Sequence, residues 1–137
     1  MASAPVHAAV GDALATAWPY TPIRLPNDGT GSPPATGEAI LDLEFPIGDE
    51  EQASIGSPGA DIWRETGAAR FVLWVPIGTG LGEWSARLDD LRRAFRGKLL
   101  GEVRMRAATP PIPFGPDDAG AFSLFSFSVA YEFDLVG

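Results

Sequence analysis

The stretch FSFSVAYEFDL, residues 125–135, alternates strictly between bulky apolar side chains and polar or small ones. Such alternation over eleven residues is typical of a β-strand that turns one face to a core. The bulky members are Phe125, Phe127, Val129, Tyr131, Phe133 and Leu135. We therefore predict a long strand here and build the rest of the fold around it.

Three further segments also have the patterns of strands. Residues 41–45 and 103–107 alternate between apolar and charged side chains, which predicts strands with one buried face. Residues 69–77, ARFVLWVPI, are apolar on both faces and predict a central strand that is covered on both sides. Residues 48–67 mix acids with Gly and Pro, and we expect an extended loop or hairpin arm, with a short strand at 52–55.

Two segments have the spacing of helices, 3–18 and 81–95, with Ser3 and Gly97 as expected caps. Their apolar stripes are Val6, Val10, Leu14 and Ala17 in the first, and Leu81, Trp84, Leu88, Leu91 and Phe95 in the second. Strands joined by short connections usually pair antiparallel. We therefore predict an α/β (α+β) fold in which a mainly antiparallel four-stranded sheet packs against two helices, as one domain over residues 1–137.

The composition excludes several classes of function. The 137 residues contain no Cys and one His, which removes disulfide scaffolds, thiol nucleophiles and most His-based chemistry. The formal net charge of −8 repels nucleic acid and anionic lipid on average. No apolar run is long enough for a membrane helix, and no Lys or Arg precedes Arg24, so the N-terminus lacks the basic region of a secretory signal. We expect a cytoplasmic protein.

Candidate catalytic groups each have a simpler explanation. Asp42 with Glu44, and Asp89 with Asp90, resemble acid/base pairs, but both lie on predicted polar faces where solvation explains them. The turn GTGLG, residues 78–82, sits where a phosphate loop would lie, yet it lacks the Lys of that motif. Residues 49–51 have no EF-hand spacing. We expect no catalytic residue, no cofactor and no metal.

The charges are unevenly distributed along the chain. Seven of the ten basic residues fall between Arg87 and Arg106, whereas three consecutive acids occupy residues 49–51. This separation suits a protein that meets its own copies or a neighbour through opposite patches. An ordinary Arg-rich helix surface explains the basic cluster equally well. Trp63 either folds back on the core or anchors an interface.

An ordered set of motifs resembles the tail-terminator-like proteins of long-tailed phages and of related particles such as prophages or gene transfer agents. The segments that carry the resemblance are QASIG at 52–56, RETG at 64–67, FVLWVPIGTGLG at 71–82, LDDLRRAFRGK at 88–98 and FSVAYEFD at 127–134.

The resemblance implies a virion structural protein and not an enzyme. It implies a homohexameric ring on the end of the tail tube that stops tube polymerisation and provides the surface for head–tail joining. The implied partners are the tail tube protein, a head-completion or connector protein, and DNA that passes through the lumen without specific binding. The implied location is the virion tail, assembled in the bacterial cytoplasm, with no membrane contact.

Two alternatives stay open: another head–tail connector or tail-completion component, and a small nucleotide-binding domain or enzyme that uses residues 78–82. For the ring, we predict that a subunit or partner interface contains Ile55, Trp63, Arg64, Arg92, Arg93 and Arg96. We predict that Asp49, Glu50 and Glu51 lie in the ring lumen.

Overall fold

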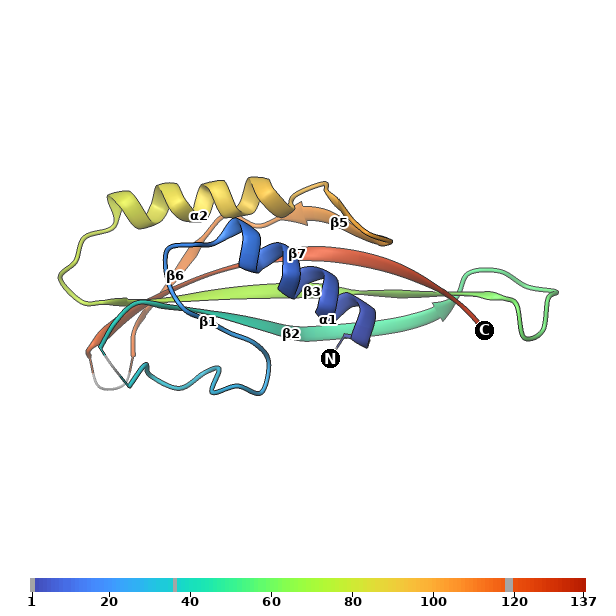
Figure 1. Ribbon diagram of the computed structural model, residues 1–137, viewed down its shortest axis with the longest axis horizontal. Coiled ribbons are helices and arrows are strands. Elements are labelled where there is room, and N and C mark those ends of the chain that lie inside the picture. The colour runs from blue at the N-terminus through green and yellow to red at the C-terminus, as the bar shows by residue number, and fades with distance from the viewer. Residues whose placement is uncertain (1, 36, 118–119) are drawn as a thin grey trace.

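A long twisted sheet forms the body of the molecule in the computed structural model, which describes residues 2–35, 37–117 and 120–137 (Figure 1). The helices are α1 (Ala4–Ala17) and α2 (Gly82–Phe95). The strands are β1 (Ile23–Arg24), β2 (Ile40–Gln52), β3 (Ile62–Pro76), β4 (Leu99–Leu100), β5 (Val103–Ala108), β6 (Ile112–Pro116) and β7 (Phe122–Val136).

The predicted fold class is wrong, because the sheet is not the mainly antiparallel four-stranded sheet that the sequence indicated. The protein is mostly β, with seven strands in the order β1-β2-β3-β7-β5-β4 and β6 paired to β7, curled into a half-barrel. The sheet is mixed because β1 runs parallel to β2, while the other pairs are antiparallel. Three strands were not predicted from the sequence. Strands β1 and β4 have two residues each, too few to show alternation, and β6 contains two prolines, which argue against a strand.

Strand β3 is central and covered on both faces, as predicted for residues 69–77. It pairs with β2 on one side and with β7 on the other, and residues 71–75 are all buried. Phe71 stacks on Phe127 with ring centroids 4.9 Å apart and meets Phe95 of α2 at 5.0 Å. On the opposite face, which we call the helix-free face, a smaller cluster forms from Val72, Trp74, Phe122 and Leu124.

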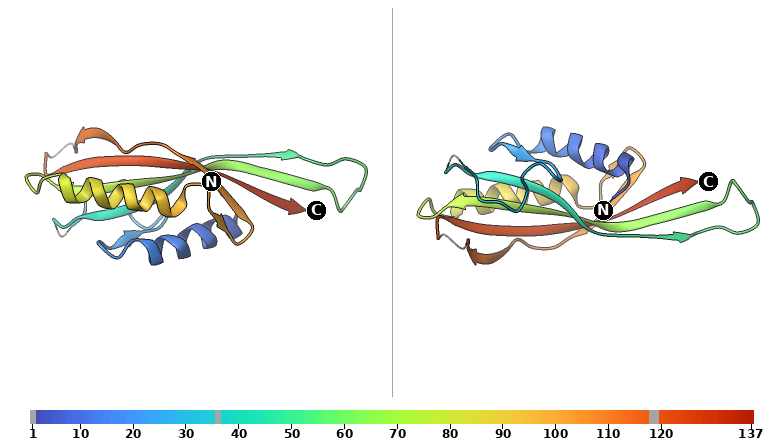
Figure 2. Two further views of the ribbon diagram at one scale, coloured as in Figure 1. Left: turned by 90° about the horizontal axis from the view of Figure 1, so that it is seen from above. Right: turned by 90° about the horizontal axis from the view of Figure 1, so that it is seen from below.

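Both predicted helices are confirmed, and both pack on the same face of the sheet (Figures 1 and 2). Val6, Val10 and Leu14 of α1 are fully buried. In α2 the buried positions are Leu88, Leu91 and Phe95, whereas Leu81 precedes the helix and is half exposed. Ser3 occupies the N-cap position, but its hydroxyl makes no capping hydrogen bond.

A hairpin extends past the helices at one end of the sheet (Figure 2). We call residues 48–67 the arm: β2 continues through a bulge between Glu44 and Ile47 to Gln52, residues 53–61 form the tip, and β3 returns from Ile62. The hairpin arm is thus confirmed, but the separate strand predicted at 52–55 is wrong, because β2 ends at Gln52. The pattern missed the second half of β2 because its exposed acids carry no apolar alternation.

Candidate functional site

The arm exposes charged and apolar side chains together. Asp49, Glu50 and Glu51 are all exposed, and no described cation lies within ion-pair distance of them. Ile55 at the tip is 92% exposed. No group of three or more His, Asp or Glu side chains that could hold a metal ion occurs in the described part of the chain.

Two strands, β2 and β7, have an unpaired side at the end of the sheet that carries the arm. Strand β1 meets β2 only at Leu41 and Asp42, so no described strand pairs with β2 on that side from 43 to 52. On the other side, β5 reaches along β7 only to Glu132. Residues 133–136 of β7 therefore pair with β3 alone among the described strands. We call these the open β2 edge (43–52) and the open β7 edge (133–136).

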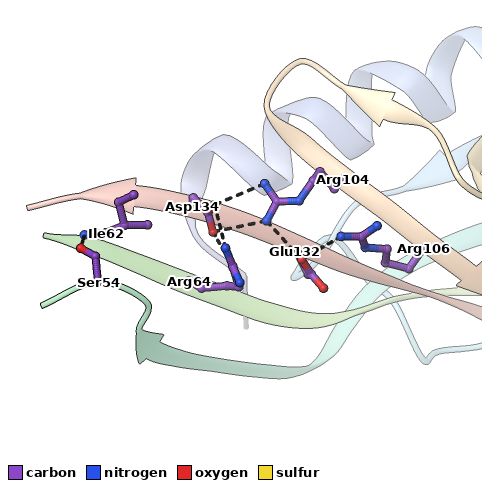
Figure 3. A network of polar contacts seen from close by, with 7 residues as sticks. All are labelled: Ser54, Ile62, Arg64, Arg104, Arg106, Glu132 and Asp134. Atoms are coloured by element: carbon purple, nitrogen blue, oxygen red, sulfur yellow. Dashed lines mark hydrogen bonds and ion pairs between the residues drawn. The ribbon is translucent and has the colours of Figure 1, made fainter.

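A network of five charged residues crosses the helix-free face beside the open β7 edge (Figure 3). Arg64 Nε lies 2.9 Å from Asp134 Oδ1, and Arg104 Nη2 lies 3.1 Å from Glu132 Oε2 and 3.3 Å from Asp134 Oδ1. Arg106 adds a contact of 3.0 Å to Glu132. Three guanidinium groups thus share two carboxylates, which leaves the network with one net positive charge.

The arginines keep both carboxylates ionised. The side-chain hydrogen bond from Arg64 lowers the pKa of Asp134 to about 2 against the opposing effect of burial. The hydrogen bond from Arg106, and then the one from Arg104, lowers the pKa of Glu132. The network is therefore fully charged at neutral pH.

The predicted interface residues fall into two places. Ile55, Trp63 and Arg64 lie on the arm with the predicted lumen residues 49–51, whereas Arg92, Arg93 and Arg96 lie on or directly after α2. Trp63 is partly buried, and its indole N–H donates to the carbonyl of Gly137 at 3.1 Å. This contact ties the base of the tip to the chain after β7, an arrangement that neither alternative for Trp63 anticipated.

Most of the basic residues between Arg87 and Arg106 form ion pairs with nearby acids. Three arginines of α2 pair with acids about one turn before them: Arg87 with Glu83, Arg92 with Asp89 and Arg93 with Asp90. Arg104 and Arg106 belong to the network described above. Arg96 and Lys98 form no ion pair with a described acid, so the exposed basic surface is smaller than the sequence indicates.

Asp42 is not solvated, contrary to the prediction. Its side chain is completely buried and accepts hydrogen bonds from the Arg24 guanidinium at 2.6 and 2.9 Å, the Gly31 N–H at 3.0 Å and the Trp74 indole N–H at 3.0 Å. The alternating pattern correctly predicts that Asp42 lies on the face opposite Leu41 and Leu43. It does not reveal that the loop of residues 25–35 covers this face. Glu44 pairs with Arg70. Asp42 thus anchors a loop.

The turn at residues 78–82 borders an apolar groove. This groove of about 380 Å³ is lined by the turn and by β3, β6 and β7, and no charged side chain is among its described lining residues. Glycines 78 and 80 have positive φ angles, which fits a tight turn into α2. The lining offers no cation to pair with a phosphate.

A buried polar cluster joins α1 to the base of the arm. The Tyr131 hydroxyl donates to Glu65 Oε2 at 2.6 Å, and the Ser3 backbone N–H donates to the same oxygen at 3.2 Å. Burial raises the pKa of Glu65, but these hydrogen bonds outweigh it and hold the pKa below its ordinary value. No pattern in the sequence indicates this cluster, because Ser3 and Glu65 are 62 positions apart.

Comparison with known proteins supports the fold alone. No family model matches the chain, and no curated protein matches it. A solved structure that is 22% identical aligns with a TM-score of 0.63 over 100% of this chain and 96% of the other. Within the described residues, no helix has both the length and the apolar character needed to cross a membrane.

Proposed function

We propose that the protein is a structural tail terminator, which forms a ring on the end of a phage tail tube, stops tube growth and offers a surface for head joining. The tube protein and a head-completion or connector protein are its partners in this proposal, and DNA passes through the lumen without specific binding. The virion tail is its place of action.

The observation that carries the proposal is the arm together with the open β2 edge and the open β7 edge at its two sides. A strand edge with unpaired backbone groups is a site where another chain can add. The arm extends beyond both helices (Figure 2), and its tip carries the exposed Ile55. The predicted lumen residues 49–51 lie on its β2 strand, where Asp49 and Glu50 border the start of α1. This is a shape suited to contact with further subunits, and the sequence motifs that resemble terminators run through it.

Tube growth in the presence of the protein tests the proposal. Purified tube subunits are polymerised with and without the full chain, and tube lengths and ends are examined by negative-stain microscopy. A terminator shortens the tubes and appears as a ring at one end. Another head–tail connector would bind an end without changing the length distribution. Tubes of unchanged length that carry no ring would refute the proposal.

A further inference from the structure

We propose that neighbouring copies join by adding the open β2 edge of one copy to the open β7 edge of the next, as parallel strands. The inference rests on the proposed ring and names the contact that builds it. The occupant of each edge is therefore a second copy of this chain.

Strand direction supports a head-to-tail contact. Both β2 and β7 run antiparallel to β3, so they run parallel to each other at the two sides of the arm. The two edges also lie at the same level, because Gln52 and Leu135 are both in register with Trp63. A rotation about an axis along the arm can therefore bring the β7 edge of one copy beside the β2 edge of another without reversing either strand. If the rotation closes, the open β7 edge of every copy is paired with the part of the open β2 edge at its level.

The backbone of β2 presents hydrogen-bond donors on its open side. The Ala53 N–H donates to the Ile62 carbonyl at 2.7 Å, on the side of β3. Donors alternate between the two sides of a strand in an antiparallel pair, so the N–H groups of Gln52 and Glu50 point away from β3. In agreement, the Glu50 N–H bonds to the Asp49 carboxylate at 2.9 Å and not to β3.

The charges select β7 over a second β2 edge as the partner. Two β2 edges would bring their acids together, and like charges placed opposite each other are destabilising. The register places Asp49 and Glu51 on the helix-free face, in line with Glu132 and Asp134. In the proposed junction Glu51 comes level with Asp134, whose charge is already compensated by Arg64 and Arg104. The network as a whole has one net positive charge, and its Arg106 is about half exposed.

Paired cysteines give a direct test, because the chain has no Cys of its own. The variant Ala53→Cys with Val136→Cys places one thiol directly after the open β2 edge and one on the open β7 edge. Both lie opposite Ile62, so they are at the same level and on the same face. Within one copy the two positions are separated by β3, a spacing of about 10 Å that exceeds the reach of a disulfide. Oxidation of the double variant is expected to give a ladder of covalent oligomers up to the ring. Each single variant can give dimers at most.

A backbone variant tests the same contact independently. Glu50→Pro removes an outward N–H, and Pro is tolerated on an edge strand whose N–H faces solvent. We expect it to raise the concentration needed for ring assembly by at least about tenfold, the effect of losing junction hydrogen bonds at several copies. The matched control Glu50→Gln keeps the N–H and is expected to assemble like the unmodified chain. Circular dichroism of the monomers confirms that both variants are folded.

The outcomes separate this inference from the proposed function. Wild-type rings without a covalent ladder in the double variant would overturn the edge contact and leave the terminator proposal standing. Dimers of the single variant Ala53→Cys that form as readily as the ladder would show β2-to-β2 pairing and would also overturn it. A wild-type chain that forms no ring with tube subunits present would overturn both.

Discussion

Asp42 holds a loop on the sheet, and its loss should be costly. In Asp42→Ala the Arg24 guanidinium, which is mostly buried, loses its partner, and the Trp74 indole N–H loses its acceptor. We expect a decrease of about 3–5 kcal/mol in the free energy of unfolding, the range for breaking a buried ion pair. Urea denaturation measures it. Glu44→Ala, which breaks the more exposed pair with Arg70, should cost below about 1 kcal/mol. Equal losses in the two variants would contradict the anchoring role.

Gly67 at the base of the arm allows a close approach that no other residue permits. A Cβ at this position would lie 2.3 Å from the Ile47 carbonyl oxygen and 2.8 Å from the Tyr131 hydroxyl. Gly67→Ala should therefore destabilise the protein by about 1–3 kcal/mol, as overpacking does. At Gly82, where a Cβ meets open space at the start of α2, the same change should be neutral or slightly stabilising. Thermal denaturation of the two variants side by side checks the contrast.

At the scale of elements, α2 is held to the sheet by the second half of its apolar stripe. Leu88 is 2% exposed, whereas Leu81 is 51% exposed. Leu88→Ala should reduce the free energy of unfolding by about 2–5 kcal/mol, through lost burial and the cavity left behind. Leu81→Ala is the matched control and should change it little. Unchanged stability in Leu88→Ala would show that α2 does not depend on this contact.

The junction of β3, β5 and β7 should weaken in acid. The Asp134 carboxyl has a pKa of about 2 in the folded protein against an ordinary value of 3.8. A carboxyl whose pKa is lowered by folding contributes stability that is complete above its ordinary pKa and is lost as the pH falls toward its folded value. The difference in unfolding free energy between wild type and Asp134→Asn should therefore shrink as the pH falls from about 4 to about 2. A difference that stays constant across these pH values would contradict the pairing with Arg64.

Elements with a long periodic pattern could be predicted, and those without one could not. The stripes of α1 and α2 and the alternation around Phe127 identified the elements that supply the main core. Strands β1 and β4 depend on partners far along the chain and are too short to show a period. Asp42 looked solvated because a sequence pattern distinguishes the two faces of a strand but does not reveal a loop that covers one of them. The charge network could not be predicted either, because Arg64 and Arg104 meet Asp134 only through the register of β3 and β5 against β7.

At the scale of the whole molecule, a charge reversal at residues 49–51 tests whether these acids line the ring lumen or form the junction between neighbouring copies. The triple change of Asp49, Glu50 and Glu51 to Lys should leave folding intact, because all three are exposed and unpaired with any described cation. If the acids meet a neighbour's network, the variant should lose ring assembly in vitro without DNA. If they line the lumen, rings should form normally and DNA delivery should fall in a complementation assay. Normal assembly together with normal delivery would refute both roles.

The pairing of β3 with β7 also governs when the chain can fold. It joins residues as far apart as Ile62 and Val136, and such non-local topologies fold in about milliseconds to seconds. During translation, β3 emerges with apolar side chains on both faces. Its second partner, β7, is made only after α2, β4, β5 and β6. At about 5–20 residues per second this interval lasts on the order of seconds. Nascent chains are exposed to aggregation throughout it, and any assembly through the arm is delayed until the ribosome has passed residue 136.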